Sequence, residues 1–576
     1  MHGGDLIADV LVRHGVRSLF TLCGGHISPI LVACKQRGIR VLDVRHEATA
    51  VFAADATARL AGIPGVAAVT AGPGATNTLT AVKNAQLAES PVVVLGGATA
   101  TILKGRGSLQ DIDQRALMAP HVKRFFAARR VRELVPALES ALREAREGVP
   151  GPVFVECPVD LLYDAQLVRS WYPVKERDSA SLTQRATSWY LRRHLDDLFQ
   201  DAEASSAGAP QAASVPQPDA AATARAALLL ERAERPVLLV GSQALLDPPG
   251  VHSLAQAVGA IGAPVYLSGM ARGLLGPSHP LQLRHRRKEA LREADLVILA
   301  GTPCDFRLDY GRQFGPRTRL VSANRGARAL RKNRQPDVAV LGAPDLFLRA
   351  LAARAGAAPS RFADWLDVLH GRDRAREHEI DAQATASGPG VNPLALFRAL
   401  DAELSDDAIV VADGGDFVAT ASYTLRPRRP LSWLDPGVFG TLGVGGGFAL
   451  GARLARPEAE LFVLYGDGSL GYSLMELDTF ARHGLGMVAI VGNDASWAQI
   501  AREQVEVLKD DVGTVLAPTA YHRAAEGLGA AGFEADTLPQ ALDAVRAARQ
   551  VARQGRPALV NVRLGRSEFR KGSISM

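Results

Sequence analysis

Residues 461–469 read Leu-Phe-Val-Leu-Tyr-Gly-Asp-Gly-Ser, an apolar run that ends in a glycine-flanked aspartate. The next apolar run, Met487–Val491, is followed by Asn493-Asp494. Each run is typical of a buried parallel strand, and ligands bind where such strands end. Oxygen side chains at these ends are typical ligands of a small hard cation that bridges a diphosphate. A β-turn explains Gly-Asp-Gly alone, but its pairing with Asn493-Asp494 favours the cation site.

Outward from this stretch, apolar runs of strand length alternate with helical patterns in three blocks of similar size. Such alternation predicts parallel βαβ units, so we expect an α/β fold of three doubly wound parallel-sheet domains. The predicted strands are Val16–Leu22, Ile39–Val44, Val66–Thr70, Val92–Leu95, Val153–Val155, Val237–Val240, Val265–Leu267, Leu296–Ala300, Leu320–Ser322, Ile409–Val411, Leu461–Tyr465, Val488–Val491 and Leu559–Val562. The predicted segments are a first domain 1–168, an insert and linker 169–223, a central domain 224–356, a connector 357–390 and a third domain 391–576.

The composition describes an ordinary globular protein, with 47% hydrophobic and 22% charged residues in a chain of 576. The net charge of +6 is spread among arginines mixed with acidic residues, and the signals of RNA-binding, zinc-finger and helix-turn-helix domains are absent. We therefore expect no nucleic-acid partner. The four cysteines form no CxxC pair, which predicts reduced thiols rather than zinc or disulfides. Without a signal peptide or an apolar run of about 20 residues, the sequence predicts a cytoplasmic protein with no membrane partner.

Two glycine-containing turns and one glutamate lie at predicted strand ends of the first block, namely Gly24-Gly25-His26, Gly72–Asn77 and Glu47. Each of these features also has a purely structural explanation. A glutamate in the first helical turn is favoured by the helix dipole, a lone histidine commonly caps or hydrogen-bonds, and glycine turns often serve packing. Together with a diphosphate site in the third block, they indicate a ligand that combines a diphosphate with a nitrogen heterocycle needing an acid partner. Thiamine diphosphate has both parts.

On these residues the chain resembles the thiamine-diphosphate enzymes of the acetolactate synthase and 2-hydroxyacyl-CoA lyase group. The resemblance covers nearly the whole chain and is carried by Phe20–Pro29, Arg45–Ala54, Ala68–Asn77, Gly269–Gly276, Cys304–Leu308 and Gly466–Asp494, with the insert Ser188–Leu191 and the tail Gly572–Ser575. It implies a pyrimidine-binding, a central and a diphosphate-binding domain. It further implies that the cofactor lies between the first domain of one subunit and the third domain of another, in a homodimer or homotetramer.

The resemblance also implies roles for individual residues. Glu47 would share a proton with the pyrimidine nitrogen N1′, which requires a site shielded from water, and Gln110 would lie near the reacting carbon. Mg²⁺ would be held by Asp467, Asp494 and the carbonyl of Ser496, with Asp494 in place of the family's usual asparagine. The residues expected at the cofactor are Gly24, Gly25, His26, Asn77, Gly415, Asp416, Leu442, Gly443, Gly466, Gly468 and Ser469.

Two of the implied residues have equally good structural explanations. Leu442 would be the apolar wedge between the two rings of the cofactor, but it can also be a packed leucine in a glycine-rich turn. Trp497 would line the substrate channel, but it can also be a core tryptophan. Both roles are therefore expectations that depend on where the two side chains lie.

The reaction implied by the resemblance breaks or forms a C–C bond beside a carbonyl of a small-molecule substrate. Acetolactate synthases carry Gly-Gln-His-Gln where this chain has Asp413–Phe417, and Gly-Met-Val where it has Ala498–Ile500, whereas Asp435–Thr441 is more similar to the acyl-CoA branch. We therefore expect cleavage of a 2-hydroxyacyl-CoA to formyl-CoA and an aldehyde. Acetolactate synthase-type condensation of 2-oxo acids such as pyruvate, in branched-chain amino-acid biosynthesis, and a non-catalytic cofactor-binding relative are the alternatives.

The central block carries one further candidate, the basic run Arg284–Lys288. It suits the phosphates of CoA or ADP, although a charge run is more often a solvated helix face. Acetolactate synthases carry FAD in this domain. The sequence therefore leaves open whether the central domain binds ADP, FAD, CoA or no ligand.

Overall fold

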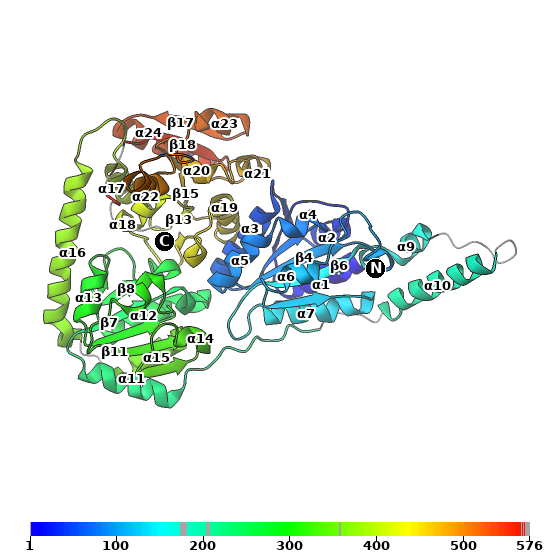
Figure 1. Ribbon diagram of the computed structural model, residues 1–576, viewed down its shortest axis with the longest axis horizontal. Coiled ribbons are helices and arrows are strands. Elements are labelled where there is room, and N and C mark those ends of the chain that lie inside the picture. Colours follow the sequence, from blue (N-terminus) through cyan, green and yellow to red (C-terminus); the bar gives the residue numbers. More distant parts are fainter. Residues whose placement is uncertain are drawn as a thin grey trace. The chain divides into compact units, whose positions relative to one another are not determined.

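The computed structural model describes residues 2–172, 181–202, 208–355, 359–565, 567, 569 and 570. The chain forms two compact units, residues 1–58 with 63–214 (unit 1) and residues 59–62 with 215–576 (unit 2). Three six-stranded sheets carry the fold, one in unit 1 and two in unit 2 (Figure 1). Their strands pair in parallel and helices connect them, which confirms the predicted α/β class with three doubly wound sheets.

The sheet of unit 1 has the order β2-β1-β3-β4-β6-β5. Every residue of its central strands β3, β4 and β6 is buried, as expected for a parallel sheet covered on both faces. The strands are β1 (Ser18–Thr21), β2 (Arg40–Asp43), β3 (Gly65–Val69), β4 (Val92–Ala98), β5 (Arg124–Ala127) and β6 (Val153–Pro158). The helices are α1 (Gly3–Arg13), α2 (Ser28–Gln36), α3 (Glu47–Ala61), α4 (Pro73–Thr76), α5 (Leu79–Ala88), α6 (Gln114–Met118), α7 (Leu134–Glu144), α8 (Val159–Leu162), α9 (Ala165–Trp171) and α10 (Leu182–Phe199).

The first sheet of unit 2 has the order β12-β11-β10-β7-β8-β9. Its strands are β7 (Pro236–Val240), β8 (Val265–Leu267), β9 (Gln282–Leu283), β10 (Leu296–Ala300), β11 (Arg319–Asn324) and β12 (Val338–Leu341). Its helices are α11 (Ala220–Arg232), α12 (Val251–Ile261), α13 (Arg287–Glu293), α14 (Ala327–Leu330) and α15 (Pro344–Ala355). Strands β8 and β9 lead into the basic segment that begins at Arg284, so this end of the sheet concentrates positive charge.

The second sheet of unit 2 has the order β14-β13-β15-β16-β18-β17. Its strands are β13 (Ile409–Ala412), β14 (Trp433–Leu434), β15 (Leu461–Gly466), β16 (Val488–Asn493), β17 (Ala531–Ala535) and β18 (Ala558–Arg563). Its helices are α17 (Pro393–Glu403), α18 (Asp416–Thr424), α19 (Val444–Ala455), α20 (Asp467–Leu470), α21 (Glu476–Arg482), α22 (Ala498–Leu508), α23 (Tyr521–Gly527) and α24 (Leu538–Arg553). The chain places β14 on one side of β13 and β15 on the other. This change of direction opens a crevice at the strand ends where ligands bind.

The polar connector predicted over 357–390 contains a long helix, α16 (Ala363–Ala384). Its side chains Trp365, Leu369 and Ile380 are buried, and the helix contacts β9 and α17 within unit 2 (Figure 1). In unit 1, the insert forms α10, which Leu195 and Leu198 anchor in the core. Residues 203–207 of the linker and the tail Gly572–Ser575 lie outside the described residues. Among the helices that are described, none combines the length and apolar character needed to span a bilayer.

Candidate active site

A cavity of about 580 Å³ lies at the carboxyl ends of β13, β15 and β16 in unit 2. Separate stretches of sequence meet there because parallel strands end at the same edge of the sheet. The predicted residues that line the cavity are Gly415, Asp416, Leu442, Gly466, Asp467, Gly468, Ser469, Asp494, Ser496 and Trp497.

Asp467 directly follows β15 and is only 2% exposed. Its Oδ1 accepts a hydrogen bond from the backbone N–H of Gly468 at 2.9 Å. Its Oδ2 is buried and has no hydrogen-bond partner among the described residues. Burying an unpaired carboxylate oxygen is costly unless a cation or donor reaches it. This oxygen is therefore suited to act as a metal ligand.

Trp497 explains why residue 468 is a glycine. A Cβ added to Gly468 would lie 2.6 Å from Cζ3 of Trp497. The indole therefore packs directly on the Gly-Asp-Gly turn, and it also lines the cavity. Trp497 is half-buried, so it packs on this turn without being a core tryptophan, and its role in the substrate channel stays a prediction.

The second oxygen donor comes from the turn after β16. Ala495 has a left-handed φ of 54°, which turns the chain sharply between Asp494 and Ser496. The N–H of Leu516 donates to the Ala495 carbonyl at 2.8 Å, and the N–H of Ser496 donates to Oδ1 of Asp494 at 3.2 Å. Such a strained backbone persists only where its surroundings hold it, and it is common at functional sites.

Asn493 takes a different direction from its neighbour Asp494. Its Nδ2 donates to the Thr519 carbonyl at 3.0 Å and to Oδ1 of Asn561 at 3.1 Å. The side chain thus ties β16 to β18 and the segment around Thr519. Of the Asn-Asp pair read from the sequence, only Asp494 lines the cavity.

The two aspartates carry an electrostatic strain that a cation would relieve. Burial raises the pKa of Asp467 to about 6. Burial, together with the charge of Asp467, raises the pKa of Asp494 to about 7. The described residues contain no group of three or more His, Cys, Asp or Glu placed to hold a metal. A cation held by these two carboxylates would therefore draw further oxygens from the Ser496 carbonyl, water and a diphosphate, a ligand set that suits Mg²⁺.

Asp416 and Gly415 begin α18 on the opposite wall of the cavity. Gly415 has a φ of 99°, which favours glycine. Oδ1 of Asp416 lies 2.5 Å from Nη2 of Arg502, a residue of α22. The carboxylate predicted to contact the cofactor thus already forms an ion pair that joins α18 to α22.

Leu442 projects over the turn that follows β13. A Cβ added to Gly414 would lie 2.3 Å from Cδ2 of Leu442, so only a glycine leaves room for the leucine. The turn after Leu442 uses Gly443 with a φ of 87°. Gly443 lies beside the cavity lining, while Leu442 is part of it. An apolar side chain thus stands in the cavity on a tightly shaped turn.

Asp413, which the sequence analysis did not select, holds this turn. It is 1% exposed, and its two carboxylate oxygens accept the N–H groups of Gly443 at 2.9 Å and Gly445 at 2.6 Å. The available signal was an aspartate placed directly after a strand and before a glycine, as at Asp467. We infer that Asp413 sets the position of Leu442.

Replacing Asp413 by Asn is expected to lower the free energy of unfolding by about 1–3 kcal/mol at pH 4 to 5, because an amide N–H would face a backbone N–H. Burial raises the pKa of Asp413 from 3.8 to about 7. Between these values the folded protein holds a proton that the unfolded chain releases, so the wild type loses stability as the pH rises. The difference between wild type and variant should therefore shrink toward pH 7. Urea unfolding at both pH values measures it, and a pH-independent difference would contradict the assignment.

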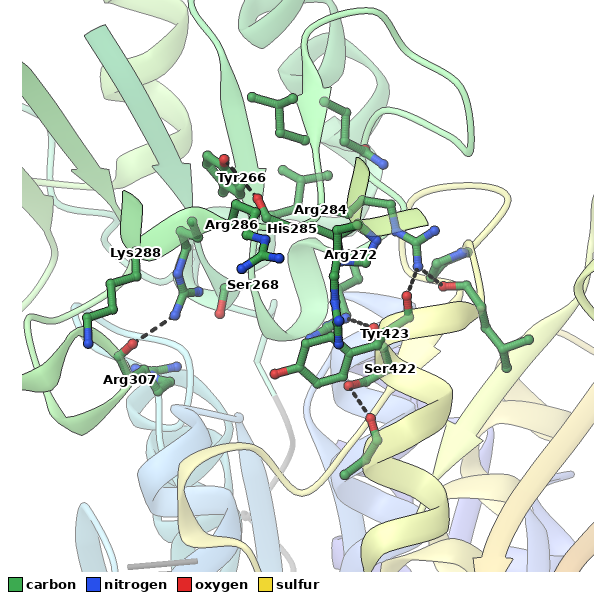
Figure 2. Close-up of a pocket in the computed structure, with 18 of the residues that line it drawn as sticks. Tyr266, Ser268, Arg272, Arg284, His285, Arg286, Lys288, Arg307, Ser422 and Tyr423 are labelled. Atoms are coloured by element: carbon green, nitrogen blue, oxygen red, sulfur yellow. Dashed lines mark hydrogen bonds between the residues drawn. The ribbon is translucent and has the colours of Figure 1, made fainter. Parts of the chain in front are cut away.

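A second cavity of about 730 Å³ lies at the carboxyl ends of β8 and β9 in unit 2. Seven arginines and one lysine line it against a single carboxylate, Glu289. Figure 2 shows basic side chains around this cavity, among them Arg272, Arg284, Arg286, Lys288 and Arg307, together with Ser422 and Tyr423. Five residues line both this basic cavity and the first cavity, which makes the two neighbours: Ser268, Arg272, Arg307, Ala419 and Ser422.

Three arginines of the basic cavity are fixed by backbone carbonyls. Arg272 donates to the Ser422 carbonyl at 2.7 Å, Arg284 to the Tyr423 carbonyl at 2.7 Å, and Arg287 to the Arg307 carbonyl at 2.8 Å. Burial lowers the pKa of all three, that of Arg284 to about 10, and the charge of Arg272 lowers the pKa of the other two further. The predicted basic run thus lines a cavity in which burial of the Arg272 and Arg287 cations is costly, whereas Arg284 already forms an ion pair with Glu377. An anionic ligand would offset this cost.

Unit 1 carries the other predicted residues. Glu47 begins α3 after β2, is 6% exposed, and accepts a hydrogen bond from Nδ2 of Asn77 at 3.0 Å. Asn77 follows the Gly72 turn at the end of β3. The structure therefore brings the buried Glu47 next to Asn77, an exposed residue whose amide orients the carboxylate.

His26 follows β1, and Gln110 lies in the segment between β4 and α6 of unit 1. Nδ1 of His26 is 3.1 Å from Oγ1 of Thr70. Gly24, which forms the turn with Gly25, leaves no room for a side chain, because an added Cβ would lie 2.4 Å from Cβ of Thr70. Gln110 has a left-handed φ of 62°, and its carbonyl would be 2.7 Å from a Cβ on Gly72. The residues of unit 1 thus surround the ends of β1 to β4.

Comparison with known proteins agrees with this geometry. The family descriptions that match are "Thiamine pyrophosphate enzyme, N-terminal TPP binding domain" over residues 1–117, "central domain" over 223–351, and "C-terminal TPP binding domain" over 413–562. Proteins named 2-hydroxyacyl-CoA lyase 2 are similar along the whole chain. That of Danio rerio is 49% identical over all of this chain and 93% of its own, and that of Homo sapiens is 48% identical over all of this chain and 92% of its own.

A more distant relative is the acetolactate synthase large subunit IlvG of Mycobacterium tuberculosis, 35% identical over 98% of this chain and 95% of its own. Both kinds of relative span nearly the full length of the chain, and each of the three matched domains covers most of one sheet. The two buried aspartates, the glycine turns and the buried glutamate are features that suit a bound thiamine diphosphate. The chain belongs to the thiamine pyrophosphate-dependent enzymes.

Proposed function

We propose that this protein is a thiamine-diphosphate- and Mg²⁺-dependent lyase that cleaves 2-hydroxyacyl-CoA into formyl-CoA and an aldehyde. The names of the relatives that are 48 to 50% identical over the whole chain support this choice over acetolactate synthesis. The observation that carries it is the basic cavity that adjoins the site of Asp467 and Asp494. Coenzyme A has a diphosphate and a third phosphate, which suit this cavity, whereas pyruvate carries only one carboxylate.

Different residues of the chain would have different roles in this reaction. Bound thiamine diphosphate supplies an electron sink that allows a C–C bond beside a carbonyl to break. Asp467 and Asp494 would hold Mg²⁺, and the N–H groups of Gly468 and Ser469 would meet the diphosphate oxygens. Leu442 would support the bent cofactor. Glu47 would hold the proton shared with N1′, in a homo-oligomer of at least two copies as the resemblance implies.

The proposed reaction needs proton transfers but no oxidant. The bond between C1 and C2 of the acyl chain breaks. The 2-hydroxyl loses its proton as C2 becomes the aldehyde carbon, and the thioester carbon gains a proton as formyl-CoA forms. Gln110 and His26 are the polar groups of unit 1 that would contact the reacting oxygens.

The deciding experiment gives the purified protein, with thiamine diphosphate and Mg²⁺, either a 2-hydroxyacyl-CoA or pyruvate. We expect formyl-CoA and an aldehyde one carbon shorter from the thioester, and little acetolactate from pyruvate. Chromatography with mass detection follows both products. Acetolactate without formyl-CoA would replace the proposal by its alternative, and no product from either substrate would favour a non-catalytic relative.

A variant tests the basic cavity within the same assay. Arg287→Met should raise KM for the CoA thioester about 10- to 100-fold, because a charge-assisted hydrogen bond is lost. It should leave the kinetics of a 2-hydroxyacyl thioester of N-acetylcysteamine, which has no phosphates, nearly unchanged. Arg292→Met is the matched control, since Arg292 is exposed on the same helix, α13, and lies outside the lining of the cavity. An equal rise in KM for both thioesters would argue against phosphate binding there.

A further inference from the structure

The segment that carries Gln110 is exposed and depends on polar contacts for its shape. Residues 99–113 (the Gln110 loop) leave β4 and lead into α6, and Leu109 within them is 81% exposed. Little apolar packing therefore fixes the loop. Yet Gln110 has a left-handed backbone, which is costly for a residue with a side chain unless its surroundings impose it.

The sheet places two buried carboxylates beside the start of this loop. Strands β4 and β6 pair in parallel with Ala98 opposite Pro158, so both chains leave the sheet at the same edge. Glu156 in β6 is 2% exposed and Asp160 in α8 is 0% exposed. A buried carboxylate is destabilising unless donors satisfy it, and for both residues the donors come from the Gln110 loop and the helix that follows it.

Glu156 holds the middle of the loop and its end. Oε1 forms an ion pair with Nζ of Lys104, whose side chain is 44% exposed. Oε2 accepts from Nε2 of Gln114 at 3.3 Å, and the same Nε2 donates to the Gly97 carbonyl at 3.0 Å. One carboxylate thus joins the loop's middle to the start of α6.

Asp160 holds the beginning of the loop. Its Oδ2 accepts both the N–H of Thr101 at 2.8 Å and the Thr101 hydroxyl at 2.6 Å. Nε2 of His194 lies 3.1 Å from the same hydroxyl, so the insert helix α10 reaches this contact. The loop is closed upon itself by Thr99 Oγ1, which donates to Ser108 Oγ at 2.8 Å.

At the other end of the loop, Gln110 contacts the turn from Gly72 to Asn77. Asn77 is the hydrogen-bond partner of Glu47. Gln110 contacts Gly72 so closely that a Cβ on this glycine would lie 2.7 Å from the Gln110 carbonyl. The turn from Gly72 continues to Asn77, which hydrogen-bonds Glu47 at 3.0 Å. The backbone of the loop therefore links the two buried carboxylates to Gln110, and the contact of Gln110 with the turn from Gly72 to Asn77 continues this link to Glu47.

We propose that Glu156 and Asp160 are positioning residues, which act through Lys104 and Thr101 to hold Gln110 in its left-handed conformation against the turn that ends at Asn77. The proposal rests on the proposed function only in that Gln110 is taken to face the reacting carbon. The anchoring of the loop itself is a property of the chain without any ligand.

The test compares Lys104→Met with Lys104→Arg. Methionine keeps the stem but removes the cation, and arginine restores it. We expect kcat for the 2-hydroxyacyl-CoA to fall at least about tenfold in the Met variant, with KM and the Kd of thiamine diphosphate nearly unchanged, because a displaced catalytic group affects the chemical step. Hydrogen–deuterium exchange of residues 99–113 in the cofactor-free protein should accelerate in the Met variant, and arginine should restore both readouts.

Two further variants keep the test decisive. Arg169→Met removes an exposed ion pair with Asp196 in the same unit and should change neither readout. Thr101→Val, with Thr101→Ser as its rescue, tests the second anchor if Lys104→Met folds poorly. Unchanged exchange in the loop of Lys104→Met and Thr101→Val would overturn the anchoring, and faster exchange with an unchanged kcat would overturn the positioning role. A wild type without lyase activity would refute the proposed function, while the exchange measurement would still decide the anchoring.

Discussion

Glu47→Gln is expected to lower kcat for the cleavage by about 10²- to 10⁴-fold, the usual contribution of a positioned acid or base. Glutamine has nearly the same shape, and its carbonyl can still accept the hydrogen bond that Asn77 now donates at 3.0 Å. It cannot hold or release a proton at neutral pH. The loss should therefore appear in the chemical step, with little change in the free energy of unfolding or in the Kd of thiamine diphosphate.

Two measurements separate this role from a structural one. Steady-state kinetics gives kcat, and NMR follows the exchange of the C2 proton of the bound cofactor for deuterium. Both should fall together in Glu47→Gln. Glu231→Gln, which removes the same charge from the exposed residue on α11, should leave both unchanged. Exchange at the wild-type rate in the Gln variant would contradict the assignment of Glu47.

The strands that the sequence analysis missed all lie at the edges of their sheets. All predicted strands are present. The strands without a prediction are β5, β9, β12, β14 and β17, and every one of them is an edge strand of its sheet. An inner parallel strand is buried on both faces and reads as a continuous apolar run, whereas an edge strand is short or partly polar. β17, with burial at only one of its five residues, illustrates this.

Helix α16 shows that a helix with few buried side chains is also hard to predict from the sequence. Its sequence is polar and charged along most of its 22 residues, which indicated a connector. Only three of its side chains are buried: Trp365, Leu369 and Ile380. Packing of so few residues against unit 2 is enough to fix the helix in place, but it leaves a weak periodic signal.

The site was predictable where a motif follows a strand, and unpredictable where a role depends on side-chain direction. Asp467 and Asp494 could be located because glycines and strand ends mark them. Asn493 could not be separated from Asp494 by sequence, since its amide turns to Thr519 and Asn561. Asp413 and Glu156 act through contacts with segments more than 25 residues away, and such pairings exist only once the sheets have formed.

The second large effect is expected for Asp467→Asn, which should weaken binding of Mg²⁺ and thiamine diphosphate by at least about 100-fold. Removing a residue that only hydrogen-bonds a metal ligand commonly lowers metal affinity about 10- to 100-fold. Removing a charged ligand itself should lower the affinity at least as much. Activity measured against Mg²⁺ concentration, and calorimetric titration of thiamine diphosphate at fixed Mg²⁺, give the two affinities. Excess EDTA should abolish the activity of the wild type, and added Mg²⁺ should restore it.

Although Asp467→Asn should weaken binding of Mg²⁺ and thiamine diphosphate, it should maintain or increase the stability of the cofactor-free protein. This combination makes the prediction specific. Oδ2 of Asp467 is buried and has no hydrogen-bond partner within the described part of the chain, and the charge of Asp467 adds to burial in raising the pKa of Asp494 to about 7. A neutral amide removes this repulsion, so the free energy of unfolding without ligand should be maintained or increased, as is common when a functional site stores strain. Asp406→Asn, at an exposed position before β13, should alter neither quantity. If Asp467→Asn instead lowers stability and leaves Mg²⁺ affinity intact, then Asp467 supports the fold of the Gly-Asp-Gly turn and the cation is held elsewhere.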